Sequence, residues 1–318
     1  VALSEGGKCD EAIPHYYTSI KLNRHYSDPY SNLSVAYASK GKIDPAIAAL
    51  KEAIRIFPHY PEAYNNLGTL LIKKKNFDVA KQVLLTALQL RPYYGKAYFN
   101  LGRMYLEQGN EQEAWNHFKK ATEGDLDNVD GFLTFGQMCM KMQKFDDAIK
   151  AFETAFKRGG KTNQVMFNLA SAYYMVKRYP SAEHLLKQLV AAFPNEHRFS
   201  YNLGEALFSQ RKYEEAAKVL AKARSLPHAM PQSHLRYAHS LEKLNQFTEA
   251  KQVLHDILQI NDAPDQIKKI AQGEIGRINL QERINESKNK PVSFTMNDLN
   301  QIMEGKTDTT ISTTGTKS

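Results

Sequence analysis

The ten histidines are the side chains of this chain best suited to bind a metal or act as a general base. Two metal ligands on one helical face, with a glutamate between them, are spaced four residues apart. His234 and His239 are five apart, and His117, His184 and His255 each fall alone in a separate predicted helix. The spacing therefore favours structural histidines and predicts no metal site.

The sequence evidence for a phosphate-binding loop, a catalytic nucleophile or a cysteine site is equally weak. The glycine pairs Gly6-Gly7 and Gly159-Gly160 fit turns and match no phosphate-loop pattern. A chain of helices also offers no strand-to-helix turn on which a nucleophile could be exposed. Cys9 and Cys139 are too far apart in sequence to indicate a disulfide framework or a zinc site. We therefore expect a protein that is not an enzyme and binds no cofactor, in a cytoplasmic setting that keeps its thiols reduced.

The composition of the chain limits the classes of partner that it is expected to bind. Of the 318 residues, 42% are hydrophobic and 24% charged, which is typical of a folded soluble protein. The chain has no apolar run of the roughly 18 residues that span a bilayer, so we expect no direct membrane contact. Its net charge of +8 comes from 42 basic and 34 acidic residues spread along the chain. Nucleic-acid-binding proteins concentrate their basic residues, so we expect no nucleic-acid interface.

The strongest signal is an internal repeat of 34 residues, with units that begin at Ser27, Pro61, Gly95, Val129, Asn163, His197 and Pro231. The fourth position is usually aromatic and the seventh large and apolar, whereas the eighth is always small. The twentieth position is always alanine, and the same phase reaches one unit further upstream: Ala12, Ala46, Ala80, Ala114, Ala148, Ala182, Ala216 and Ala250.

The repeat has a physical reading. Apolar residues at spacings of three and four predict two amphipathic helices in each unit. Small residues at the eighth and twentieth positions allow the helices to approach closely in a dense interior. Pro58, Pro92 and Pro194 end the second helix of three units. One such hairpin cannot bury its apolar face alone, so the units are expected to stack into an all-α solenoid.

This pattern resembles the tetratricopeptide repeat over roughly residues 1–262. The resemblance implies a right-handed superhelical solenoid of stacked helix-turn-helix units. We expect an incomplete first unit at 1–26 and seven units over 27–262. Four units lack the terminal proline, and their junctions are expected to be looser; the replacing residues are Leu126, Gly160, His228 and Asp262.

The two ends differ. The incomplete first unit and the missing initiator methionine lead us to expect that the chain is part of a longer polypeptide. An apolar stripe over 263–285 resembles the helix that caps such arrays; it contains Ile267, Ile270, Ala271, Ile275 and Ile278. Residues 286–318 are rich in Ser and Thr and are expected to be disordered. In this tail Phe294, Leu299, Ile302 and Met303 are candidates for a short amphipathic turn that docks onto the solenoid or a partner, although a featureless tail is favoured.

By the resemblance, the first helix of each unit lines a concave face, with positions 2, 5, 6, 9, 12 and 13 directed into it. The sixth position reads Asn32, Asn66, Asn100, Thr134, Asn168, Asn202 and Arg236. An asparagine amide offers two donors and its carbonyl an acceptor, so a regular row can bond to the backbone of an extended peptide. The row is similar to the asparagine ladder of O-linked N-acetylglucosamine transferases, which implies that the five asparagines bind peptide. We add Arg236 to this predicted set.

Two other interpretations of the groove stay open. Asn-Leu-Gly belongs to a common version of the repeat, in which the asparagine bonds to neighbouring helices, and Thr134 interrupts the row. Met140, Tyr174, Met175 and Phe208 at positions 12 and 13 fit either an apolar pocket or simple packing. A clamp for chaperone C-termini needs a lysine at the fifth position, where none of the seven units has one.

The sequence thus predicts a non-catalytic scaffold that binds extended segments of a partner protein in its concave groove. The alternative is a substrate-recruiting arm of a larger O-glycosyltransferase, of the soluble or the membrane-embedded kind, truncated from this chain. If the chain is attached to an upstream membrane domain, we expect a periplasmic or lumenal compartment instead of the cytoplasmic one.

Overall fold

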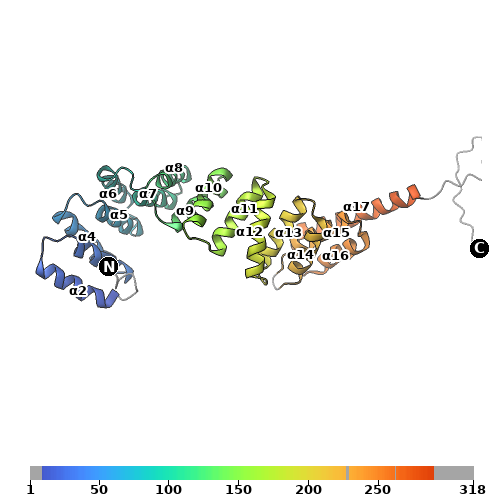
Figure 1. Cartoon of the computed structure of the whole chain (residues 1–318), viewed down its shortest axis with the longest axis horizontal. Coiled ribbons are helices and arrows are strands. Elements are labelled where there is room, and N and C mark those ends of the chain that lie inside the picture. Colours follow the sequence, from blue (N-terminus) through green and yellow to red (C-terminus); the bar gives the residue numbers. More distant parts are fainter. Residues whose placement is uncertain (1–8, 227–228, 262, 290–318) are drawn as a thin grey trace, which may run out of the picture. The chain divides into compact units, whose positions relative to one another are not determined.

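A computed structural model describes residues 9–226, 229–261 and 263–289, which form sixteen α-helices (Figure 1). In chain order these are α2 (Cys9–Leu22), α3 (Asp28–Ser39), α4 (Ile43–Ile56), α5 (Pro61–Lys73), α6 (Phe77–Leu90), α7 (Gly95–Glu107), α8 (Glu111–Glu123), α9 (Val129–Lys141), α10 (Phe145–Lys157), α11 (Asn163–Met175), α12 (Tyr179–Ala192), α13 (His197–Ser209), α14 (Tyr213–Ser225), α15 (Pro231–Lys243), α16 (Phe247–Gln259) and α17 (Asp265–Asn289).

The helices follow the repeat phase without a slip. Every second helix of a unit, from α4 to α16, begins at the seventeenth position, and α2 occupies the same place in the incomplete first unit. The first helices begin at the first position, except that α3 begins one residue later. The predicted all-α fold of helical repeats is confirmed. The turn Gly6-Gly7-Lys8 lies outside the described residues.

The turn between the two helices is held by the same backbone geometry in every unit. Its fifteenth residue has a positive φ each time, at Gly41, Lys75, Gly109, Gln143, Lys177, Arg211 and Asn245. The following N–H bonds to the carbonyl five residues back, for example from Lys42 to Tyr37 at 2.9 Å. This arrangement satisfies carbonyls at the end of the first helix. Only two units use glycine there, so the other five place an ordinary side chain in a conformation that costs about 1–2 kcal/mol.

Small residues set the distance between paired helices. The eight alanines at the twentieth position are all buried. Gly68, Gly102 and Gly136, at the eighth position, face the large residue at the twenty-fourth position of the same repeat. A Cβ atom on Gly136 would lie 2.4 Å from Cε1 of Phe152, and one on Gly102 would lie 2.7 Å from Cδ1 of Phe118. Both phenylalanines are completely buried, so these glycines leave room that the rings fill.

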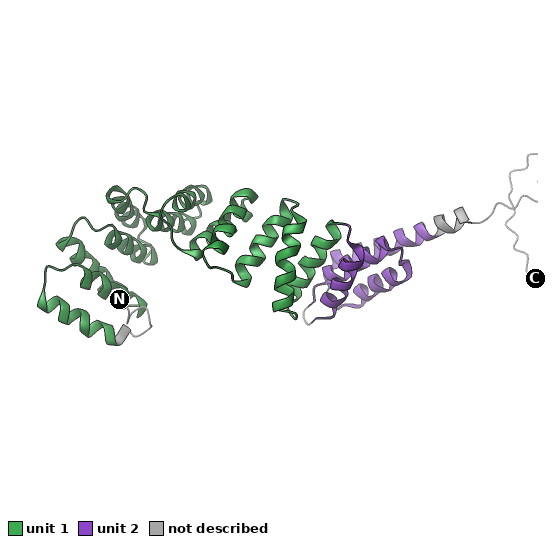
Figure 2. Ribbon diagram, in the orientation of Figure 1, with its two compact units in different colours: residues 1–210 green, residues 211–318 purple. Residues whose placement is uncertain are grey.

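The chain divides into two compact units, residues 1–210 and 211–318 (Figure 2). The boundary falls between α13 and α14, inside the sixth full repeat, where the repeat pattern predicts no break. In the first unit the core runs through helix pairs such as α5 and α6, with Leu67, Leu84 and Leu101 at its centre. The second unit has its own core around Leu254, which packs between α15, α16 and α17.

Helix α17 covers the end of the second unit. Its Ala271, Ile275 and Ile278 are buried against Leu254 and Ile257 of α16, as the apolar stripe predicts. Ile270 is the exception, since it is 39% exposed. The helix continues to Asn289, four residues beyond the predicted end of the cap. The tail 290–318, with Phe294, Leu299, Ile302 and Met303, lies outside the described residues.

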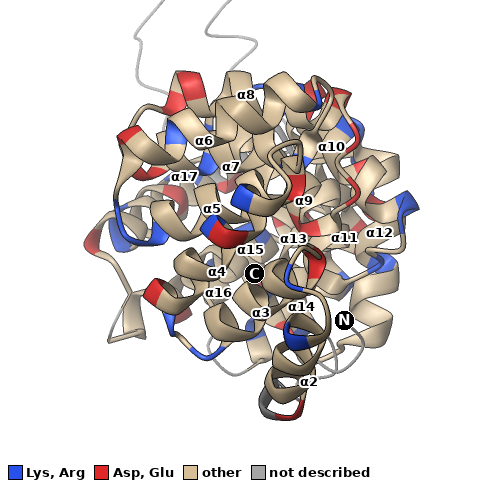
Figure 3. Cartoon of the chain, turned by 90° about the vertical axis from the view of Figure 1, so that its left-hand side faces the viewer, with Lys and Arg blue, Asp and Glu red and all other residues tan. Residues whose placement is uncertain are grey.

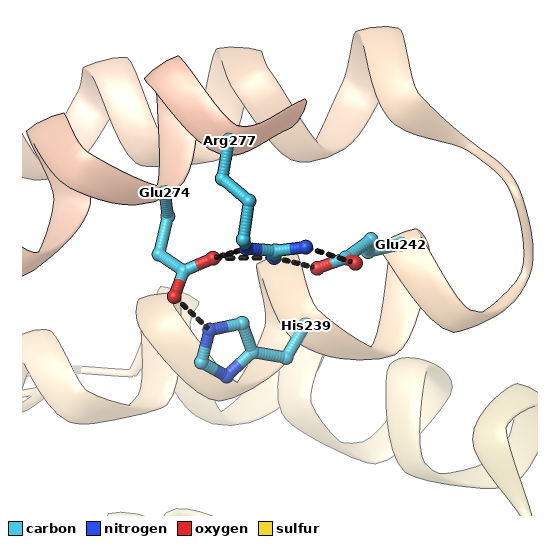
Figure 4. A network of polar contacts seen from close by, with 4 residues as sticks. All are labelled: His239, Glu242, Glu274 and Arg277. Atoms are coloured by element: carbon cyan, nitrogen blue, oxygen red, sulfur yellow. Dashed lines mark hydrogen bonds and ion pairs between the residues drawn. The ribbon is translucent and has the colours of Figure 1, made fainter. Parts of the chain in front are cut away.

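A polar network ties α17 to α15 (Figure 4). Arg277 bridges two carboxylates: its Nη1 donates to Oε1 of Glu242 at 2.8 Å, and its Nε donates to Oε2 of Glu274 at 2.7 Å. The hydrogen bond from Arg277 lowers the pKa of Glu242. Nε2 of His239 lies 3.9 Å from Oε1 of Glu274, and burial lowers the pKa of this histidine.

Gly136→Ala is expected to destabilise the protein by about 1–3 kcal/mol, because the added methyl group overpacks a filled core against Phe152. Gly273→Ala is the matched control, since nothing lies within 4 Å of its added Cβ. Alanine is favoured over glycine in an exposed helix by about 1 kcal/mol, so the control should be neutral or stabilising. Urea unfolding measures both, and equal stability of the two variants would contradict the packing account.

Acidification is expected to loosen the α15–α17 contact. Glu242 has a lowered pKa in the fold, so its contribution is complete above the unfolded value of about 4.3 and is lost as the pH falls through the folded value. Arg277→Gln should therefore lower stability by at most about 1 kcal/mol at pH 7 and flatten the loss toward low pH. Arg103→Gln, on α7, is the control, because this arginine forms no ion pair within the described part of the chain. Unfolding curves between pH 3.5 and pH 7 decide the point, and parallel profiles of wild type and Arg277→Gln would argue against the network.

Candidate functional site

Within residues 1–210, three pairs of successive first helices touch: α5 with α7, α9 with α11, and α11 with α13. Because the phase is constant, their sixth-position side chains fall on the same side of the array. The asparagine row comprises Asn32 on α3, Asn66 on α5, Asn100 on α7, Asn168 on α11 and Asn202 on α13. Arg236, the last predicted residue, lies on α15 in the second unit.

The amide of Asn100 is used inside the protein. Its Nδ2 donates to Oδ1 of Asn65 on α5 at 2.8 Å, and both side chains are buried. Nδ2 of Asn65 lies 3.4 Å from Oδ1 of Asn66 and donates to it. This chain of amides joins α5 to α7, so at Asn100 the asparagine does bond to a neighbouring helix.

Two further positions of the row bond within their own helix. Nδ2 of Asn202 donates to the carbonyl of Arg198 at 2.8 Å. The hydroxyl of Thr134, which interrupts the row, donates to the carbonyl of Asp130 at 2.8 Å. The sixth positions therefore differ in what they can still offer to a ligand, although the sequence presents them as equivalent.

Asn168 stands apart from the others. It lines a cleft of about 390 Å³ between α11 and α13. Its Nδ2 is buried and has no hydrogen-bond partner among the residues that the structure describes. A buried donor without an acceptor costs about 1–3 kcal/mol. A carbonyl or carboxylate oxygen of a ligand in this cleft would remove that cost.

Two aromatic rings and a guanidinium group border the same cleft. The rings of Phe167 and Phe199 are 5.4 Å apart, and the guanidinium carbon of Arg198 lies 5.9 Å and 6.0 Å from their centroids. Arg198 also donates to Glu196. The cleft thus combines a flat apolar wall with an unsatisfied donor, which suits one amino-acid residue of an extended chain. These three residues are not among the predicted site residues. The signal for them in the sequence is the phenylalanine at the fifth position of one repeat and the arginine at the second position of the next.

The apolar residues predicted for the groove are not equivalent either. Oη of Tyr174 lies 3.3 Å from Oε2 of Glu205 and 3.3 Å from Oγ of Ser209, so it joins α11 to α13. Met175 is 51% exposed, whereas Met140 and Phe208 are half-buried. Tyr174 therefore has a packing role, and Met175 is the apolar surface that a ligand could reach.

The reactive side chains are held in structural contacts. The ring of His117 stacks on Tyr105 with centroids 5.2 Å apart, and burial lowers the pKa of His117. Burial raises the pKa of the Cys139 thiol to about 11. Within the described part of the chain, no group of three or more His, Cys, Asp or Glu residues is placed to hold a metal ion.

Two further observations concern membrane crossing and the distribution of charge. None of the helices described here is long and apolar enough to cross a membrane. Figure 3 shows basic and acidic segments interspersed along the helices.

Asn65→Ala is expected to lower stability by about 1–3 kcal/mol, because it leaves the buried amide of Asn100 without its acceptor. Asn202→Ala removes only a bond within one helix from a half-buried position and should change stability by less than about 0.5 kcal/mol. Thermal and urea unfolding of the two variants measure this difference. Equal effects would show that the Asn65–Asn100 pair has no special role in joining α5 to α7.

The solved structures to which the chain is similar include several tetratricopeptide-repeat proteins. It is 17% identical to a tetratricopeptide repeat protein from Parabacteroides merdae ATCC 43184, covering 78% of this chain and 98% of that one with a TM-score of 0.43. Residues 41 to the end of MamA from Desulfovibrio magneticus RS-1 are 18% identical, with 54% and 98% covered and a TM-score of 0.49. YrrB, described as a TPR protein with an unusual peptide-binding site, is 18% identical, with 62% and 97% covered and a TM-score of 0.43. These likenesses concern the fold alone.

No curated protein sequence matches the chain. A family model does match it, over residues 28–234, which is well over half of its length. That stretch runs from the start of α3 into α15 and includes the whole asparagine row. The chain therefore belongs to the family described as the cilia and flagella-associated protein 70 C-terminal domain.

Proposed function

We propose that this protein is a non-catalytic scaffold whose first helices bind an extended segment of a partner protein. The observation that carries the proposal is the buried amide of Asn168, which faces a cleft and has no acceptor among the described residues. A peptide carbonyl in the cleft would accept this hydrogen bond, and an adjacent side chain of the peptide would pack on Phe167.

The other members of the asparagine row have graded roles in this proposal. Asn32 and Asn66 are half-buried and offer amide groups to the peptide backbone. Asn100 and Asn202 have one amide hydrogen engaged already, so they contribute their remaining groups. Arg236 belongs to the second unit and would bind a separate part of the partner. Hydrogen bonds to the peptide backbone do not depend on the side chains of the partner, so we expect many different peptide sequences to bind. We expect moderate affinity, because ordering a peptide costs entropy.

The family suggests where the partner works. Its description associates it with cilia and flagella, and we propose that the bound segment belongs to a protein of that organelle. The protein would then act there as an adaptor, in place of the general cytoplasmic setting expected from its thiols.

The alternative, a recruiting arm of a larger O-glycosyltransferase, uses the same groove and differs in what adjoins it. The asparagine row supports both functions, and no contact among the described residues favours the transferase. We therefore place it second. The mass of the native protein in its own cells separates the two, because a transferase adds tens of kilodaltons and brings glycosyl-transfer activity with it.

Binding is testable with one peptide selected from a displayed library of random 16-residue sequences. We expect Asn66→Ala combined with Asn168→Ala to weaken that peptide by about tenfold, which corresponds to about 1.4 kcal/mol lost over two hydrogen bonds. Fluorescence anisotropy of the labelled peptide gives both affinities. Asn116→Ala, on the second helix α8, is the matched control and should bind like wild type.

Thermal unfolding of the double variant must first show an intact fold. Unchanged affinity in a folded double variant would refute peptide binding by the asparagine row. Peptide binding by the asparagine row would also be refuted if the library yielded no peptide that binds at the Asn168 cleft.

A further inference from the structure

A second cleft opens on the side of the second helices. It has a volume of about 570 Å³ and lies between α10 and α12, with α11 forming its floor. Phe156, Leu169, Tyr173, Pro180 and Leu185 give it an apolar lining. None of these residues lines the Asn168 cleft, which is formed by first helices only. The two clefts are therefore on separate surfaces of the compact unit formed by residues 1–210.

The apolar lining is specific to the cleft between α10 and α12 and is not required by the repeat fold. One repeat earlier in the chain, a cleft of about 430 Å³ between α8 and α10 occupies the corresponding position. There Thr122, Lys150 and Ala151 stand at the positions that Phe156, His184 and Leu185 hold in the apolar cleft. Since the fold accepts Thr122 and Ala151 at two of these positions, stacking alone does not explain the large apolar side chains of Phe156 and Leu185.

Charge at the edge of the apolar cleft is mainly positive. Oη of Tyr173 donates to Oε1 of Glu153 at 2.7 Å, which engages the one carboxylate in the lining. Lys157 and Lys161 are exposed, and Nζ of Lys161 lies 5.5 Å from the ring centroid of Phe156. Neither lysine has a carboxylate partner among the described residues. The cleft thus presents an apolar floor beside two unpaired cations.

From this combination we infer that the cleft between α10 and α12 is a second protein-docking site. It takes a segment of a partner protein in which a large aliphatic or aromatic side chain is flanked by carboxylates. The apolar side chain enters the cleft, whose volume is in the range typical of ligand sites. The flanking carboxylates face Lys157 and Lys161, which gives the contact its charge complementarity. With the asparagine row on the first helices, the scaffold can hold two segments at once.

The test uses a blocked hexapeptide with leucine and phenylalanine between two pairs of glutamates. Two control peptides replace the glutamates by lysines or the two apolar residues by serines. Methyl NMR signals of Leu169 and Leu185 report binding at the cleft in the full chain. We expect the acidic apolar peptide to shift these signals and to bind at least about fivefold tighter than either control.

Two variants locate the contact. Ser181→Trp places a large ring in the cleft from an exposed position in the first turn of α12, and should weaken the acidic apolar peptide by about tenfold. Lys157→Glu should weaken it by about fivefold. Lys51→Glu, the same charge change at an exposed position of α4, should leave it unchanged. Asn66→Ala with Asn168→Ala should also leave it unchanged, so this site and the proposed groove fail separately.

Three results would overturn the inference. The serine peptide could bind as well as the acidic apolar one, or Ser181→Trp could leave the affinity as it was. Alternatively, the Leu185 signals could shift with protein concentration alone while sedimentation shows a dimer, which would assign the cleft to a second copy of the chain.

Discussion

In the three repeats that span residues 61–162, the contact between the eighth and the twenty-fourth residue fixes how closely the two helices of a repeat lie. In these repeats the eighth residue is glycine, and a leucine side chain or a phenylalanine ring fills the space that a Cβ atom would need, as Phe152 does over Gly136. The twentieth-position alanine allows a similarly close approach, and all eight are buried. Because this spacing recurs every 34 residues without insertion, the successive repeats within residues 1–210 keep the same phase. The side-chain rows on both sides of the array depend on that constancy.

The two sides of the array acquire different chemistry from this one constraint. First helices contact one another, so their outward positions form a surface of closely spaced polar groups, among them the asparagine row. Second helices leave clefts over the first helix between them, and the side chains at a few variable positions decide whether a cleft is polar or apolar. A scaffold of this kind carries function in the residues that the packing leaves free to vary.

Much of the fold follows from the sequence because the repeat samples the same solution many times. Eight alanines in register predict every helix pair, and the proline pattern adds little, since Leu126 is buried at the place of a terminal proline without disturbing the phase. The site was less predictable. Asn100 and Asn168 look alike in sequence, yet one amide bonds to Asn65 and the other has no partner among the described residues. The acceptor of Asn100 is the fifth-position residue of the preceding repeat, Asn65, whereas the corresponding residue for Asn168 is Leu133, whose side chain offers no acceptor. The boundary between α13 and α14 has no counterpart in the repeat pattern, and neither has the continuation of α17 to Asn289, four residues beyond the predicted cap.

The side-chain amide of Asn168 is the most direct probe of the central claim that the first helices bind an extended peptide. Nitrogen-15 NMR can follow its two Nδ2 protons while a library-selected peptide is added to the full chain. We predict that one of these protons shifts downfield and exchanges more slowly with water, as a buried donor does when it gains an acceptor. An Asn168 amide that keeps its free-state shift and exchange rate at saturating peptide would contradict the account.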